Sequence, residues 1–165
     1  MKHLNLTPSQ FCDATAACED GREFALTQQT MADVWAHCPK AEWLLWILDV
    51  IDAPRNDKQL RLFAVWCARN TPMPDGRTTG ALLTDPRSIA ALEVAERYAH
   101  EMATAVELAA ARDAAWDAAW DAARNGARDA ARDAAWAAAW AAARAAQADQ
   151  LRKMIANPFE QGGAK

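Results

Sequence analysis

Apolar residues recur at helical spacing along most of the chain. The most apolar run, 43–48, is followed by Val50 and Ile51, which leaves few directions of a helix free of apolar side chains. We therefore expect residues 41–51 to form a helix at the centre of a domain. Residues 57–69 repeat apolar positions at intervals of three and four, which predicts a second amphipathic helix. The pattern as a whole predicts an all-α fold.

Helix starts are marked by hydroxyl or carboxylate side chains that can cap backbone N–H groups. The signals stand at Thr7-Pro8, at Thr30, at Thr84-Asp85-Pro86 and at Thr104 with Glu107. We expect the first helix to end near residues 19–21, while residues 22–29 fit no element clearly. The segment 70–83 holds two prolines and two glycines, which predicts a loop.

From residue 112 to residue 144 the chain follows a four-residue repeat rich in alanine. Its lead positions hold only arginine or tryptophan: Arg112, Trp116, Trp120, Arg124, Arg128, Arg132, Trp136, Trp140 and Arg144. Alanine has the highest helix propensity of all residues, so the repeat favours a helix before any packing is considered.

A four-residue period does not match the 3.6 residues of a helical turn. Each lead position therefore advances about 40° around the axis, and Trp116 and Trp136 would lie about 200° apart on one straight helix. Asn125-Gly126 offers a turn, because glycine is the preferred residue just past a helix end. We expect a helical hairpin turning at Asn125-Gly126, and one unbroken helix from 104 to 155 is the alternative.

The tryptophans and arginines of the repeat are open to two interpretations. They could form an internal Trp/Ala packing seam beside a solvated charged face. They could instead form a partner-binding surface, because Trp and Arg are enriched at binding hot spots. The candidate partner-binding residues are Trp116, Trp120, Arg124, Arg128, Arg132, Trp136 and Trp140.

The shift from mixed helices to the repeat predicts three parts. Residues 1–103 would form an N-terminal helical core domain, 104–156 the Ala-rich helical arm, and 157–165 a flexible tail.

Charge and hydropathy argue against two classes of partner. The net charge is −4, and residues 112–144 hold five Arg and five Asp, so nothing drives phosphate or anionic lipid binding. The longest apolar run is far shorter than a membrane span, and the first residues lack a secretory apolar segment. We therefore expect a cytoplasmic protein that binds neither nucleic acid nor membrane.

Candidate chemistry is sparse. The four cysteines have no metal-ligand or redox spacing and lie in apolar helical patterns, which favours buried thiols. An enzyme would need His37, Cys38 or His100 to meet acidic partners in a pocket. Asp113, Asp117 and Asp121 form one row on one helix, which is more typical of a solvated face than of a metal site. We therefore expect no catalytic residues, cofactor or metal.

Several segments carry a resemblance in order and spacing: 58–69, 82–88, 91–99, the repeat itself and 147–152. In them the chain resembles a family of uncharacterised alanine-repeat proteins of phages and bacteria, some of which are labelled immunity proteins. Residues 11–12 and 18–23 look like the phage-encoded members. The resemblance implies a helical fold and a phage or prophage setting, and it brings no catalytic residues.

These observations lead to a hypothesis of function. We expect a phage protein that binds and inhibits a host protein or protein complex, such as an anti-defence factor of the anti-CRISPR kind. A toxin-neutralising immunity protein is one alternative. A structural module that self-assembles through the repeat helix, for example as a homodimer, is another.

Overall fold

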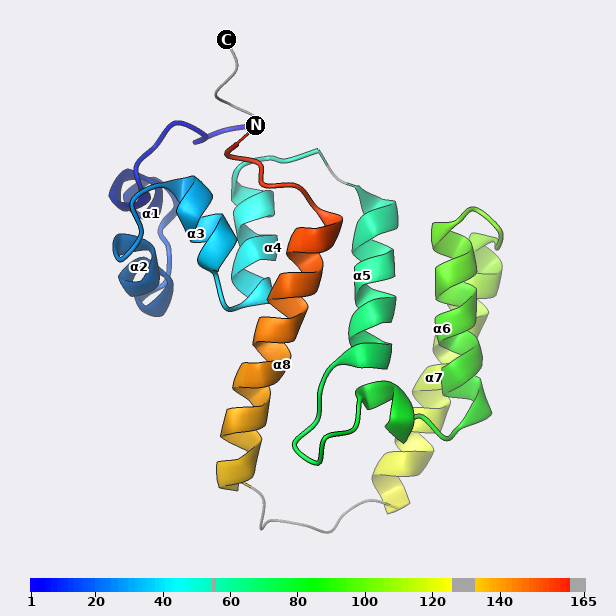
Figure 1. Ribbon diagram of the computed structural model, residues 1–165. Coiled ribbons are helices and arrows are strands. Elements are labelled where there is room, and N and C mark those ends of the chain that lie inside the picture. Colours follow the sequence, from blue (N-terminus) through cyan, green and yellow to red (C-terminus); the bar gives the residue numbers. More distant parts are fainter. Residues whose placement is uncertain (55, 126–132, 161–165) are drawn as a thin grey trace. The chain divides into compact units, whose positions relative to one another are not determined.

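The computed structural model describes residues 1–54, 56–125 and 133–160, with side chains described outside 120–139 (Figure 1). Over these residues it is all-α, as predicted, and its only β pairing is an isolated bridge between Pro72 and Thr78. The helices are α1 (Pro8–Thr15), α2 (Glu19–Leu26), α3 (Met31–His37), α4 (Ala41–Val50), α5 (Asp57–Asn70), the 3-10 helix η1 (Thr79–Leu82), α6 (Pro86–Ala99), α7 (Ala105–Asn125) and α8 (Asp133–Met154).

The predicted caps begin the helices where the sequence placed them. Thr7 and Thr30 each form a capping box with the residue three positions later. Thr104 accepts from the Glu107 backbone N–H, and the Glu107 carboxylate accepts from the Thr104 N–H and hydroxyl. These bonds to Thr104, with Arg97 nearby, hold the pKa of Glu107 below its ordinary value. Local chemistry therefore fixes these starts.

The first helix was predicted to run too far. It ends at Thr15, because Ala16 adopts the left-handed conformation at a φ of 51° and the Ala17 N–H bonds back to the Cys12 carbonyl. A separate helix, α2, then begins at Glu19 and covers most of the segment that the pattern left unassigned. Gly21, expected near a helix end, lies inside α2.

The chain forms two compact units. The first comprises residues 1–55 with 147–165, and the second comprises residues 56–146. The core of the first unit includes the fully buried Trp35, Leu44 and Ile51 from α3, α4 and the residue after α4, together with Leu151 from α8. The prediction that residues 41–51 lie centrally is confirmed for the buried stripe of Leu44, Ile47 and Ile51.

The C-terminal segment belongs to the first unit, and the predicted parts 1–103, 104–156 and 157–165 do not coincide with this division. The Arg152 guanidinium donates to the carbonyls of Cys38 at 2.7 Å and Trp35 at 3.4 Å, at the end of α3. The Asn157 side chain donates to the Ala32 carbonyl, and the Phe159 ring lies edge-on to Phe11. Residues 157–160 are therefore held by packing and hydrogen bonds, whereas 161–165 lie outside the described residues.

The second unit contains α5, η1, α6, α7 and the first part of α8. Thr71 and Thr79 both donate hydroxyl hydrogen bonds to the Cys67 carbonyl, which ties the loop after α5 to the end of that helix. A Cβ added to Gly80 would lie 2.6 Å from the Arg69 carbonyl oxygen, so η1 approaches α5 more closely than a side chain allows. The predicted loop at 70–83 is thus a closed turn, with Gly76 at a φ of +81°.

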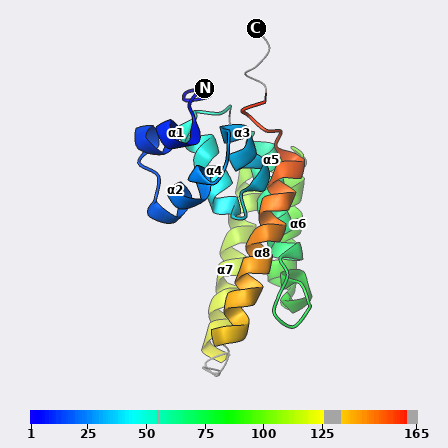
Figure 2. The ribbon, with the colours of Figure 1, turned by 60° about the vertical axis from the view of Figure 1, so that its left-hand side comes forward.

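Helices α6 and α7 pack side by side (Figure 1), and Figure 2 gives a second view of the same helices. The less exposed positions of α7 follow intervals of three and four: Leu108, Ala111, Ala114, Ala115 and the fully packed Ala118. Leucine and alanine therefore form the contact stripe of this helix. The hairpin predicted at Asn125-Gly126 depends on residues 126–132, which lie outside the described residues, so it stays a prediction.

Candidate functional site

The predicted partner-binding surface can be assessed at two of its seven residues. The Trp116 side chain on α7 is 65% exposed, and the Trp140 side chain on α8 is 53% exposed. The side chains of Trp120, Arg124 and Trp136 lie outside the described set, as do Arg128 and Arg132 entirely. Both tryptophans of the repeat whose side chains are described therefore lie at the surface.

Helix geometry explains why Trp116 is exposed. At 100° per residue, Trp116 points about 140° away from the mean direction of the contact stripe that faces α6. The small alanines of the stripe are therefore the packed residues, and Ala118, two residues from Trp116, is only 3% exposed. The same contrast holds on α8, where Ala143 is buried and Trp140 is not. On both helices, therefore, an alanine side chain is buried and the described tryptophan is exposed.

Charged side chains accompany the exposed tryptophans. Arg112, Asp113 and Asp117 are exposed on α7, and Arg144 is exposed on α8 one helical turn after Trp140. The Arg112–Asp113 ion pair has an N–O distance of 3.9 Å and side chains more than three-quarters exposed, so solvent screens most of its attraction. The predicted stacking of Arg124 on Trp120 and of Arg132 on Trp136 lies outside the described side chains.

The two neighbouring candidates for enzyme chemistry, His37 and Cys38, lie in different surroundings. Cys38 is fully buried and donates its S–H to the Lys40 carbonyl, and burial raises the pKa of its thiol. His37 is exposed and meets the Gln28 side chain, while His100 lies in the other compact unit. No group of three or more potential metal ligands occurs among the described residues.

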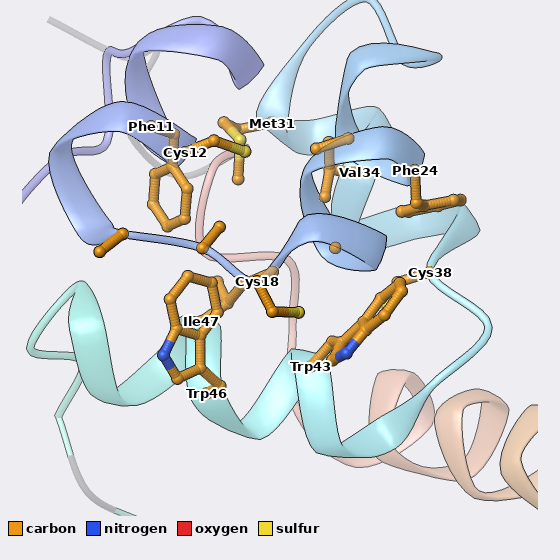
Figure 3. Close-up of a pocket in the computed structure, with 14 residues that line it drawn as sticks. Phe11, Cys12, Cys18, Phe24, Met31, Val34, Cys38, Trp43, Trp46 and Ile47 are labelled. Carbon is orange, nitrogen blue, oxygen red and sulfur yellow. The ribbon is translucent and has the colours of Figure 1, made fainter.

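One concave site in the first unit was not predicted from the sequence. It is a cavity of about 380 Å³ between α1, α2, α3 and α4, lined by aromatic, aliphatic and thiol side chains (Figure 3). The four cysteines are free thiols, as expected, but their burial is uneven: Cys12 and Cys38 are buried, Cys67 is half-buried and Cys18 is exposed. The break at Ala16 brings the loop that holds Cys18 to the cavity, and no local sequence signal marks that break.

No family model, curated protein or solved structure matches this chain. The resemblance to alanine-repeat proteins of phages and bacteria therefore stays a prediction. Among the described residues, no helix is both long enough and apolar enough to cross a bilayer.

Proposed function

We propose that this chain is a protein-binding inhibitor that acts by steric contact rather than catalysis. Its binding surface is the exposed side of the repeat helices, where Trp116 and Trp140 present large indole rings beside arginine and aspartate. The partner is a host protein or protein complex, and the setting is that of a phage anti-defence factor of the anti-CRISPR kind. The phage setting is proposed because the sequence resembles alanine-repeat proteins of phages and bacteria.

The exposure of Trp116 and Trp140 is the observation that supports this proposal. Eight tryptophans in 165 residues is a high number, and burial in the core is where most of their apolar area would contribute to stability. At an interface, by contrast, a tryptophan that enters a desolvated pocket contributes about 2 kcal/mol or more to binding. The exposed faces of the Trp116 and Trp140 rings can enter such a pocket on a partner.

The experiment is affinity capture from a bacterial host lysate with the full chain as bait. The proposal expects one host protein at near-stoichiometric yield, and failure to recover any stoichiometric partner would refute it. A Trp116→Ala/Trp140→Ala variant should be used as bait in a parallel capture. This variant should retain its helical content and should not recover the partner.

Two rival functions have their own readouts. A structural module would self-assemble through the repeat, and light scattering would then show a dimer or a larger species in the absence of other proteins. An immunity protein would neutralise a toxin encoded beside it, so the neighbouring gene identifies that case. The exposed tryptophans are compatible with each rival, and these measurements separate them.

A further inference from the structure

The lining of the cavity in the first unit combines large aromatic side chains with small residues. Phe11 meets Trp46 edge-on with ring centroids 6.1 Å apart, and Phe24 lies 6.0 Å from Trp43. The lining also includes four small residues from the end of α1, the following loop and α2: Ala16, Ala17, Gly21 and Ala25. Figure 3 shows the aromatic side chains around the site.

Gly21 keeps part of this space open. A Cβ placed there would lie 3.1 Å from the Cys18 sulfur and 3.9 Å from the Trp43 ring. Even one methyl group at this position would therefore press on Cys18 at the edge of the site. Glycine inside a helix is about 1 kcal/mol less favourable than alanine. Gly21 therefore lowers the stability of α2 but leaves this part of the cavity unfilled.

Buried side chains form the base of the cavity, and exposed or half-buried side chains form its rim. Cys12, Met31 and Ile47 are each 3% exposed, whereas Cys18 at the rim is exposed and Trp43 and Trp46 are half-buried. Burial raises the pKa of the Cys12 thiol, so this thiol is neutral at physiological pH. The cavity therefore offers apolar surface below and access to solvent above.

We propose that this cavity binds a small, uncharged, apolar molecule of the size of two or three aromatic rings. Its volume of about 380 Å³ lies within the usual range of small-molecule sites, about 300–1,000 Å³. No charged side chain lines it among the described residues, so a charged ligand would lose its hydration without an ionic partner. Walls from four helices enclose the ligand from several directions, which a flat docking face does not. The inference is independent of the proposed function, because the site lies in the other unit from Trp116 and Trp140.

The test uses N-phenyl-1-naphthylamine, a neutral three-ring probe whose fluorescence rises in apolar surroundings. Titration into the full chain should give saturable binding of one probe per chain. Ala17→Trp places an indole in the cavity and should weaken binding at least about tenfold. Ala14→Trp is the matched control, because Ala14 is exposed on α1 and does not line the site, and its binding should equal that of wild type.

A second arm avoids any effect of substitution on folding. N-phenylmaleimide adds to the exposed Cys18 thiol of the folded protein and places a phenyl ring at the rim, so the conjugate should lose probe binding. A Cys18→Ser variant given the same treatment should still bind. The Trp116→Ala/Trp140→Ala variant should also bind the probe, which separates this site from the repeat surface. Non-saturable fluorescence would overturn the proposal, and so would binding by Ala17→Trp and by the conjugate that equals the binding of wild type.

Discussion

Arg152 connects the last helix to the end of α3, and its replacement by methionine should destabilise the first unit. The guanidinium supplies hydrogen bonds to the carbonyls of Cys38 and Trp35, which lie at the α3 C-terminus, where no helical N–H is left to bond them. Methionine keeps the apolar stem but removes the donors and the positive charge.

The magnitude follows from one short and one long hydrogen bond. The bond to the Cys38 carbonyl, at 2.7 Å, is charge-assisted and ends on a fully buried residue, so its loss should cost about 1.5–3 kcal/mol. The 3.4 Å contact with the Trp35 carbonyl and the i,i+3 pair with Asp149 add at most a few tenths. We therefore expect the free energy of unfolding to fall by about 2–3 kcal/mol.

The assay is urea unfolding followed by far-ultraviolet circular dichroism, with Lys153→Met as the control. Lys153 is the exposed neighbour on the same helical turn, so its replacement should change stability by less than about 0.5 kcal/mol. If Arg152→Met and Lys153→Met unfold at the same urea concentration, α8 is not held on α3 through this side chain and the assignment of 147–160 to the first unit loses its main support.

Three further predictions concern packing and thiol chemistry. Ala118→Phe should overpack the stripe of α7 and cost about 1–3 kcal/mol in thermal unfolding, whereas the exposed Ala119→Phe should cost much less; equal melting temperatures would contradict the seam. Gly80→Ala should lower stability by about 1–3 kcal/mol, because its Cβ would meet the Arg69 carbonyl oxygen, and an unchanged melting temperature would show that η1 does not pack so closely. Burial raises the pKa of the Cys12, Cys38 and Cys67 thiols, so the unfolded chain loses these protons at lower pH than the folded chain. The free energy of unfolding should therefore fall as pH rises above about 8.5, and it should fall less steeply in Cys38→Ala; identical slopes would argue against a buried Cys38 thiol.

Helix starts could be predicted from the sequence because a cap is a local structure. Thr7, Thr30 and Thr104 each satisfy backbone donors within three residues, so the information lies within one turn. The end of α1 could not be predicted in the same way. Ala16 is a strong helix former in the left-handed region, which its own propensity opposes. After the break α2 packs against α1, and a contact of this kind cannot be predicted from the type of residue at position 16.

The two compact units have other boundaries than the predicted parts for a related reason. Arg152 and Cys38 are 114 residues apart, and the types of these two residues do not predict the hydrogen bond between them. A shift in composition marks where the repeat begins, but it does not say which unit the end of the repeat helix joins. Exposure of Trp116, by contrast, is consistent with the mismatch between a four-residue period and a 3.6-residue turn, which moves the lead positions around the helix. The sequence therefore indicated that the tryptophans could not all lie on one face of a straight helix. The exposure of Trp116 could be seen only in the structure.

The most direct test of the central claim is the amount of host partner captured per mole of bait. Wild type should be compared with Trp116→Ala/Trp140→Ala and with Val106→Ala, because Val106 is a still more exposed apolar residue on α7 that precedes the repeat. The double variant should keep wild-type helicity and capture at least about tenfold less host partner than wild type does, while Val106→Ala should capture as much as wild type. Full capture by a folded double variant would contradict the claim that the exposed tryptophans form the binding surface.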